Sequence, residues 1–209
     1  GQSRETDIDV GRGPVTIHIP SSYDPLVPEP LVLLLHGYTS TGAGVEAYMR
    51  FLPLSETHGF LYAYPDGTAE PDGDQFWNAT DACCDGSSPP GVDDSGYLRG
   101  LIDAIAAQLN VGEVFLIGHS NAGFMSYRMA CDHADRITAI ASLAGATFLD
   151  PAACTPSATV RTLQIHGTAD ATISYEGGST SLGAYPGAVA TTEQWATYDS
   201  CSLEATAGG

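Results

Sequence analysis

Short, largely apolar segments alternate along this chain with segments whose apolar residues recur every three or four positions. Five consecutive apolar residues at Leu31–Leu35, bounded by proline and glycine, are typical of a parallel strand buried on both faces. Similar runs predict strands at Phe60–Tyr64, Val114–Ile117, Ile137–Leu143 and Val160–Ile165. Before them, two strands with alternating apolar positions are expected at about Thr6–Val10 and Val15–Ile19.

Helical spacing is clearest over Asp94–Asn110, where a pair of aspartates stands at the expected N-cap and Gly112 follows the end. Asn121–Cys131 and about Ala188–Tyr198 are two more predicted helices. Strands that alternate with helices predict an α/β fold, with a mostly parallel sheet and helices on both faces.

Composition narrows the classes of function. The chain has 209 residues, 43% of them apolar and 15% charged, as expected for one globular domain. All 7 basic residues are arginines, so chemistry that needs a lysine, such as a Schiff base or a phosphate-loop lysine, is excluded. A formal charge of −18 argues against nucleic acid as a partner, and the lack of any bilayer-length apolar run argues against a membrane.

Candidate chemistry lies at the carboxyl ends of the predicted strands, where sheets of this class place their sites. Three segments qualify: His36–Thr39, Gly118–Gly123 and His166–Asp170. In the second, a strand leads through a Gly-His-Ser-Asn-Ala turn directly into a helix, which is the arrangement of a nucleophile elbow. This context predicts a catalytic serine at Ser120, whereas the alternative is a serine that only caps the helix.

A serine nucleophile needs a carboxylate, a histidine and an oxyanion hole. Asp170 follows a strand end and is the predicted acid; otherwise it only caps its own loop. The predicted oxyanion donors are the backbone amides of Asn121 and Tyr38, with Thr39 as second choice. His119 is expected to pack beside the serine.

The remaining site predictions are weaker. His36 and His166 are expected to be structural histidines that bond neighbouring loops. Trp77, with Phe76, either lines an acyl or aryl pocket or packs in the core. Thr39 and His119 are further candidates for substrate contact. No cysteine pair has CxxC spacing and no histidine stands at ligand spacing from a cysteine, so no zinc site is predicted. No cofactor is expected either.

An ordered set of motifs gives a more specific indication. The motifs are Leu33–Gly37, Trp77–Asn78 with Cys83–Cys84, Val92–Tyr97, Gly118–Met125 and His166–Asp170. Together they resemble the polyhydroxybutyrate depolymerase and feruloyl esterase group of secreted α/β-hydrolases. The resemblance implies a secreted, disulfide-bearing, metal-free esterase with Ser120 as nucleophile and Asp170 as acid. It also implies that the residue after His-Gly, here Tyr38, lends an oxyanion amide.

One part of this pattern is missing. The histidine of the triad should follow the acid, yet none of the six histidines lies after Asp170. We therefore expect residues 1–209 to be a single catalytic domain without the family's last strand, histidine loop and last helix. A C-terminal fragment or second chain would then carry the histidine. The alternatives are a non-catalytic binding module on a hydrolase fold, or an acyltransferase or peptidase. The ester substrate is either an aryl ester on a polysaccharide or a polyester.

The five cysteines fit an oxidising, secreted setting, and their odd number leaves one unpaired within these residues. At least one disulfide is predicted among Cys83, Cys84, Cys131 and Cys154, with the pairing left open. Cys201 is the cysteine expected to lack a partner here.

Overall fold

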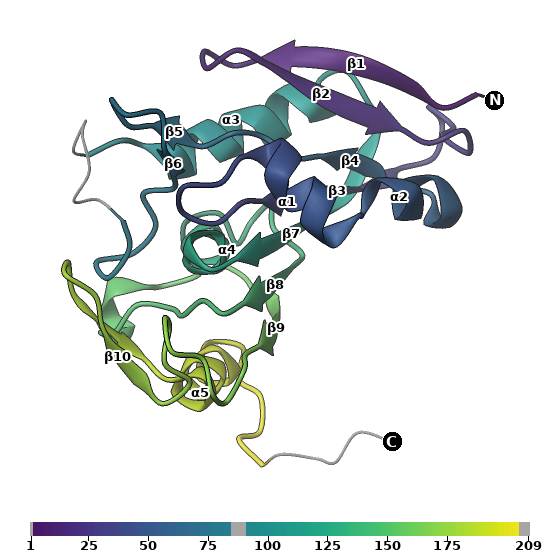
Figure 1. Ribbon diagram of the computed structural model, residues 1–209. Coiled ribbons are helices and arrows are strands. Elements are labelled where there is room, and N and C mark those ends of the chain that lie inside the picture. Colours follow the sequence, from purple (N-terminus) through teal and green to yellow (C-terminus); the bar gives the residue numbers. More distant parts are fainter. Residues whose placement is uncertain (1, 85–90, 205–209) are drawn as a thin grey trace.

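A sheet of seven strands in the order β1-β2-β4-β3-β7-β8-β9 forms the centre of the computed structural model, which describes residues 2–84 and 91–204 (Figure 1). Its strands are β1 (Arg4–Asp9), β2 (Pro14–Ile19), β3 (Glu29–Leu35), β4 (Leu61–Ala63), β7 (Val111–His119), β8 (Ala139–Leu143) and β9 (Arg161–Ile165). β1 and β2 pair antiparallel, whereas β4, β3, β7, β8 and β9 run parallel to one another. The predicted mostly parallel sheet is confirmed.

Helices cover both faces of the sheet, as the alternating pattern predicted (Figure 1). They are α1 (Gly42–Met49), α2 (Leu52–His58), α3 (Asp94–Ala106), α4 (Asn121–Asp132) and α5 (Ala188–Tyr198). The apolar residues of α3, α4 and α5 join one core cluster, and those of α1 and α2 join a second cluster on the other face. Short elements complete the chain: β5 (Thr68–Ala69), β6 (Gln75–Phe76), η1 (Pro151–Ala153), β10 (Gly177–Ser179) and β11 (Ala184–Pro186).

The ends of the elements differ from the predictions where tertiary contacts extend or shorten them. β7 runs from Val111 to His119 because it pairs with β3 and β8 over most of that length, whereas the apolar run alone predicted a shorter strand. α3 starts where expected, because the Asp93 carboxylate accepts a hydrogen bond from the Gly96 amide (2.7 Å), but it ends at Ala106. α1 was not predicted, since glycines interrupt its apolar spacing; its signal is the N-cap Thr41.

The sheet is covered unequally. The registers place Ile117, Ala141 and Leu163 side by side on the face that α1 and α2 cover over β3 and β4. Toward β9 this face opens to solvent: Leu163 is 56% exposed and Ile165 is 49% exposed. Among the described residues, no strand pairs with the outer side of β9. The sheet therefore ends on an open edge beside an apolar surface.

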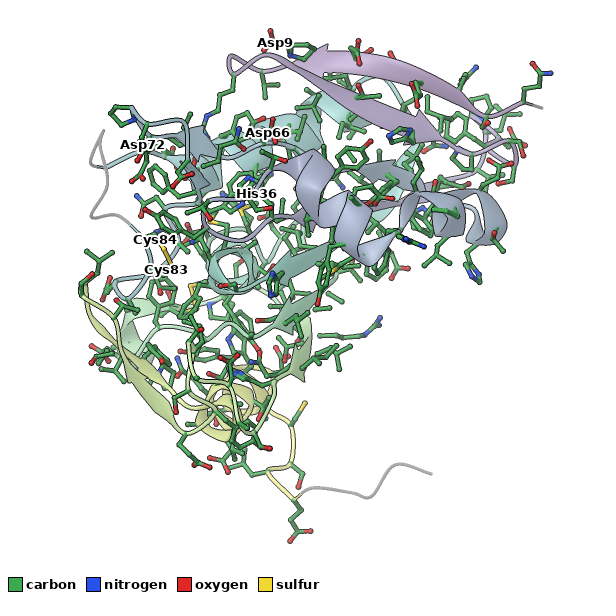
Figure 2. All side chains as sticks on the ribbon, in the orientation of Figure 1. Asp9, His36, Asp66, Asp72, Cys83 and Cys84 are labelled. Atoms are coloured by element: carbon green, nitrogen blue, oxygen red, sulfur yellow. A yellow bond between two sulfur atoms is a disulfide. The ribbon has the colours of Figure 1, made fainter. Side chains whose placement is uncertain are left out.

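Two disulfides are present, so the prediction of at least one is confirmed. Cys131, on α4, is joined to Cys154 just after η1, across a sequence separation of 23 residues. The second bridge joins the neighbours Cys83 and Cys84 (Figure 2). Cys201 is unpaired and exposed. Over the described ranges, no helix combines the length and the apolar character needed to span a membrane.

Candidate active site

Ser120 lies at the tip of the turn that joins β7 to α4. Its backbone has φ 56° and ψ −119°, a conformation that residues other than glycine rarely adopt. The turn is tight because strand and helix nearly touch: a Cβ added to Gly118 would lie 2.0 Å from the carbonyl oxygen of Ala122. Ala122 itself, which stands where the elbow pattern has glycine, is fully buried and fits. The geometry is that of a nucleophile elbow.

The backbone holds Ser120 in place while its hydroxyl remains available. The Ser120 amide donates to the carbonyl oxygen of Leu143 (2.8 Å), and the Ser120 carbonyl oxygen accepts from the amide of Gly123 (2.7 Å). Its side chain makes no capping hydrogen bond at the start of α4. The alternative, in which the Ser120 side chain caps α4, therefore does not match the structure.

A pocket of about 260 Å³ opens in front of Ser120. It is lined by Gly37, Tyr38, Ser40, Gly44, Val45, Tyr48, His119 and Ser120. Half of these residues come from α1 and the residues just before it, so sequence reasoning missed them together with α1. Exposed rings of Tyr38 and Tyr48 flank the pocket, and the Tyr38 hydroxyl donates to Glu70 (3.0 Å). This hydrogen bond raises the pKa of Tyr38.

The two amides predicted to donate to an oxyanion are both available. Within the described part of the chain, neither the Tyr38 amide nor the Asn121 amide donates a hydrogen bond. The amide of Thr39, the second choice, is already engaged with the carbonyl oxygen of Gln75 (2.8 Å), because Thr39 turns away with φ 64°. Thr39 does not line the pocket either, so neither of its predicted roles fits this arrangement.

Trp77 does not line the pocket, contrary to one of its two interpretations. Both Trp77 and Phe76 have no exposed surface, and the Trp77 indole N–H donates to the carbonyl oxygen of His36 (3.0 Å). Core packing was the other interpretation, and it is the one that the structure bears out. A single sequence does not distinguish a pocket residue from a core residue here, because either role is compatible with an aromatic side chain after a strand.

Asp170 lies in the loop after β9, with one carboxylate oxygen held and the other free. Its Oδ1 accepts from the amides of Thr172 (2.9 Å) and Ile173 (3.0 Å), and these hydrogen bonds lower the pKa of Asp170. Among the described residues, Oδ2 accepts no hydrogen bond; its nearest cationic candidate, His166 Nε2, is 3.8 Å away. The loop-capping interpretation therefore accounts for one oxygen only, and Oδ2 is able to accept from a histidine.

Both strand-end histidines are structural, as predicted. His36 accepts from the Gly67 amide at Nε2 (2.9 Å), so its Nδ1 carries the proton that bonds the Gly37 carbonyl oxygen (2.8 Å). Burial lowers the pKa of His36. His166 bonds the Ile173 carbonyl oxygen through Nε2 (2.7 Å) and Gln164 through Nδ1 (3.1 Å). Neither ring has a nitrogen left for proton transfer.

The other histidines do not complete a triad. His119 lines the pocket beside Ser120, where burial lowers its pKa and the Asp170 carboxylate partly opposes that shift. His18 pairs with Glu5 and His133 contacts Ser95, both away from the elbow, while His58 is exposed at the end of α2. No histidine of the described chain hydrogen-bonds to the Ser120 hydroxyl.

Comparison with known proteins bears on this arrangement. A family model described as the alpha/beta hydrolase fold matches residues 83–192. NocK of Nocardia uniformis subsp. tsuyamanensis, provisionally named an esterase, is 31% identical over 161 residues, which are 75% of this chain and 45% of NocK. Feruloyl esterase B of Piromyces equi is 26% identical over 200 residues, 91% of this chain and 36% of that protein. The chain thus spans less than half the length of these relatives.

A solved structure extends the likeness to the whole fold. The acetyl xylan esterase from Aspergillus awamori superposes with a TM-score of 0.69 at 18% identity, covering 98% of this chain and 82% of that one. At this identity the likeness concerns the fold. Together with the sequence relatives, it confirms the predicted resemblance to the feruloyl esterase group, while the polyhydroxybutyrate depolymerase side of that resemblance stays a prediction.

Proposed function

This chain belongs to the alpha/beta hydrolase family, and we propose that it is the catalytic domain of a secreted serine carboxylesterase. The observation that carries the proposal is the elbow: Ser120 has an uncapped hydroxyl on a strained turn and lines a pocket together with Tyr38. Among the described residues, the backbone amides of Tyr38 and of Asn121, the residue after the serine, donate no hydrogen bond. A serine that only shaped the turn would gain from glycine at that position. Secretion is supported by two disulfides, which persist in oxidising compartments.

The proposed reaction proceeds through an acyl-enzyme. The Ser120 hydroxyl attacks the ester carbonyl carbon while a histidine takes its proton, and the amides of Tyr38 and Asn121 donate to the oxyanion. The tetrahedral intermediate collapses and releases the alcohol, which receives that proton. Water then attacks the acyl-enzyme by the same steps, and the acid leaves. Asp170 Oδ2 accepts from the imidazole and stabilises its protonated form.

We propose that the histidine belongs to polypeptide outside these 209 residues. Both ring nitrogens of His36 and of His166 are already hydrogen-bonded. His119 is the last residue of β7, directly before Ser120 in the chain. The open edge of β9 and the exposed side chains of Leu163 and Ile165 offer a backbone and an apolar surface for that polypeptide to pack against. In this arrangement the histidine loop reaches Asp170 at the same end of the sheet.

Among esters, we propose an uncharged ester on a polysaccharide, with an aryl or small acyl group. The pocket holds about 260 Å³ and is flanked by the rings of Tyr38 and Tyr48. Glu70, together with neighbouring aspartates on the same hairpin, places negative charge at its mouth and disfavours an anionic ester. Comparing the release of ferulate, acetate and hydroxybutyrate from defined substrates separates this proposal from a polyester depolymerase.

Labelling with a fluorophosphonate probe tests the nucleophile directly. The native polypeptide that carries this sequence should be labelled once, at Ser120, and Ser120→Ala should abolish both labelling and hydrolysis. His58→Gln is the matched control, because His58 is exposed at the end of α2, and it should keep full activity. His119→Gln tests the alternative base: labelling of Ser120 should persist if the base lies elsewhere, whereas loss of both labelling and hydrolysis would make His119 the base. A folded native protein that binds polysaccharide but is never labelled would instead be a binding module. Acyl transfer to alcohols would identify an acyltransferase, and peptide cleavage without ester hydrolysis would identify a peptidase.

A further inference from the structure

The segment of β6 and Trp77 lies between the two parts of the site and is hydrogen-bonded to both of them. On one side it holds the loop after β3. The Trp77 indole N–H donates to the carbonyl oxygen of His36 (3.0 Å), and the Thr39 amide donates to the carbonyl oxygen of Gln75 (2.8 Å). These anchored residues stand on either side of Tyr38 in the chain. The free amide of Tyr38 is therefore presented by a loop that is held at two points.

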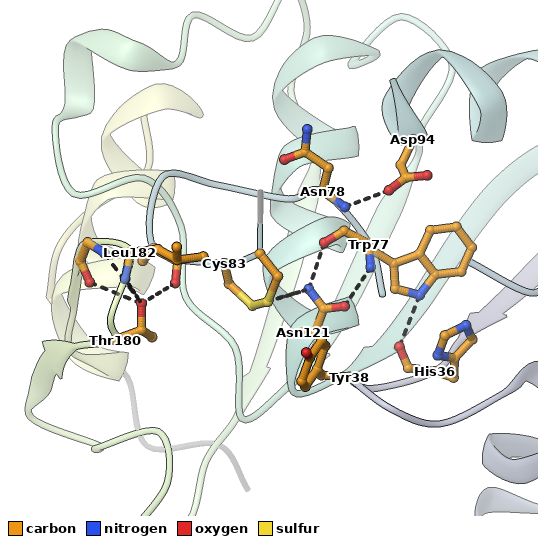
Figure 3. Close-up of a disulfide and its surroundings, with 12 residues drawn as sticks. His36, Tyr38, Trp77, Asn78, Cys83, Asp94, Asn121, Thr180 and Leu182 are labelled. Carbon is orange, nitrogen blue, oxygen red and sulfur yellow. Dashed lines mark hydrogen bonds between the residues drawn. A yellow bond between two sulfur atoms is a disulfide. The ribbon is translucent and has the colours of Figure 1, made fainter. Parts of the chain in front are cut away.

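On its other side, the same segment holds the elbow through Asn121 (Figure 3). The Asn121 side chain accepts from the Trp77 amide (2.7 Å) and donates to the Trp77 carbonyl oxygen (2.8 Å), so it pairs with this one residue much as a neighbouring strand does. Its Nδ2 also lies 3.2 Å and 3.3 Å from the sulfurs of Cys83 and Cys84. Asn121 is 1% exposed and Trp77 is 0% exposed, and buried hydrogen bonds of this kind restrict motion strongly.

Trp77 thus connects the residues that carry the two free amides, although these come from distant parts of the chain. We propose that Trp77 is a positioning residue that holds the amides of Tyr38 and Asn121 at the separation an oxyanion requires. The inference rests on the proposed function. Its physical basis is that oxyanion donors act only within a narrow range of distances, so a small displacement of either amide lowers the rate.

A purely structural role for Trp77 makes a different prediction. Its ring fills the core and stacks near the ring of His36, with 5.2 Å between centroids, so any large truncation would disturb packing. Loop and elbow also touch directly, because a Cβ on Gly37 would lie 3.4 Å from the Ser120 Cβ. That contact limits how close the segments come but does not orient an amide. The test must therefore remove the indole N–H and compare the effect with the same truncation at a second buried tryptophan, which loses the same ring volume.

Trp77→Phe removes the donor to His36, and Trp195→Phe is a matched control. Trp195 is also fully buried and donates its indole N–H to a single acceptor, Thr147 Oγ1 (3.0 Å), and its ring lies against those of Tyr127 and Tyr198. Among the described residues, its indole makes no hydrogen bond to the loop after β3 or to the elbow. In the native polypeptide, Trp77→Phe should lower kcat by about 10- to 100-fold and change KM by less than about 2-fold. Trp195→Phe should destabilise the protein comparably and keep kcat within about 2-fold of the wild type.

Inhibitor affinity distinguishes a displaced oxyanion amide from a general loss of rigidity in the protein. A trifluoromethyl ketone forms a tetrahedral oxyanion on the serine, so Trp77→Phe should weaken it by the same factor as kcat/KM, whereas the affinity for the product acid stays unchanged. If Trp77→Phe does not fold, Asn121→Asp tests the other side. It keeps an acceptor for the Trp77 amide but loses the donor to the Trp77 carbonyl oxygen, and kcat should again fall at nearly constant KM.

The outcomes separate the two proposals. A native protein without esterase activity or labelling overturns the proposed function itself. An active wild type whose Trp77→Phe and Asn121→Asp variants keep kcat within about 2-fold overturns the positioning role alone. Equal losses of kcat and stability in Trp77→Phe and Trp195→Phe would also overturn it, because Trp77 would then be an ordinary core residue.

Discussion

The backbone strain at Ser120 predicts how the free energy of unfolding changes when this residue is replaced. The residue has φ 56° and ψ −119°, and its own side chain makes no capping hydrogen bond at the start of α4. A non-glycine residue held there costs about 1–3 kcal/mol. Glycine avoids this cost but gains about 0.4–1 kcal/mol of freedom in the unfolded chain, which opposes the benefit. Ser120→Gly should therefore be more stable than Ser120→Ala by about 1 kcal/mol, although neither variant hydrolyses esters.

The comparison of glycine with alanine isolates the backbone, because both variants lack the hydroxyl. Urea unfolding followed by tryptophan fluorescence should show the midpoint of Ser120→Gly higher by about 0.5 M, for a slope of about 2 kcal/mol per molar urea. Ala107→Gly is the control: Ala107, the C-cap residue that follows α3, has an ordinary φ of −72°, so glycine there relieves no strain and should destabilise by up to about 1 kcal/mol. A Ser120→Gly variant no more stable than Ser120→Ala would refute the assignment of strain to this turn.

Three further predictions concern the elbow, the acid and a disulfide. Gly118→Ala should lower the unfolding free energy by about 1–3 kcal/mol or more and suppress labelling, since its Cβ would lie 2.0 Å from the Ala122 carbonyl oxygen; unchanged labelling would contradict this. Asp170→Asn should reduce kcat by at least about 100-fold. Because loop amides lower the pKa of Asp170, its charge stabilises the fold above the ordinary carboxyl pKa and stops doing so as the pH falls through the lowered value. The stability gap to Asp170→Asn, measured by urea unfolding, should thus stay constant from about pH 7 to about pH 5 and narrow as the pH falls below about 4; a gap that stays constant down to about pH 2 would refute the linkage. Replacing Cys131 and Cys154 by alanine should cost about 3 kcal/mol in urea unfolding, given their sequence separation of 23 residues, whereas a loss below about 1 kcal/mol would argue against that bridge in solution.

Much of the fold and the core of the site were predictable because they are written in short stretches of sequence. The apolar run at Leu31–Leu35 predicted β3, and the strand-turn-helix pattern around Ser120 predicted the elbow. Both depend on neighbours within a few residues, where backbone sterics and hydrophobic period act directly. The same holds for Asp170, whose Oδ1 accepts from amides two and three residues further along.

Other features depend on partners far away in the chain, and only the tertiary structure decided them. His36 has a structural role because it accepts a hydrogen bond from the Gly67 amide. Trp77 lies in the core rather than in the pocket wall because it is hydrogen-bonded to Asn121 and His36. The residues next to Trp77 in the sequence do not indicate whether its side chain lines the pocket or packs in the core. Its hydrogen-bond partners decide this, and they come from the loop after β3 and from the elbow. Sequence alone thus determined where the proposed reacting groups stand along the chain. Tertiary packing decided which polar groups are already satisfied, and therefore which remain free to react.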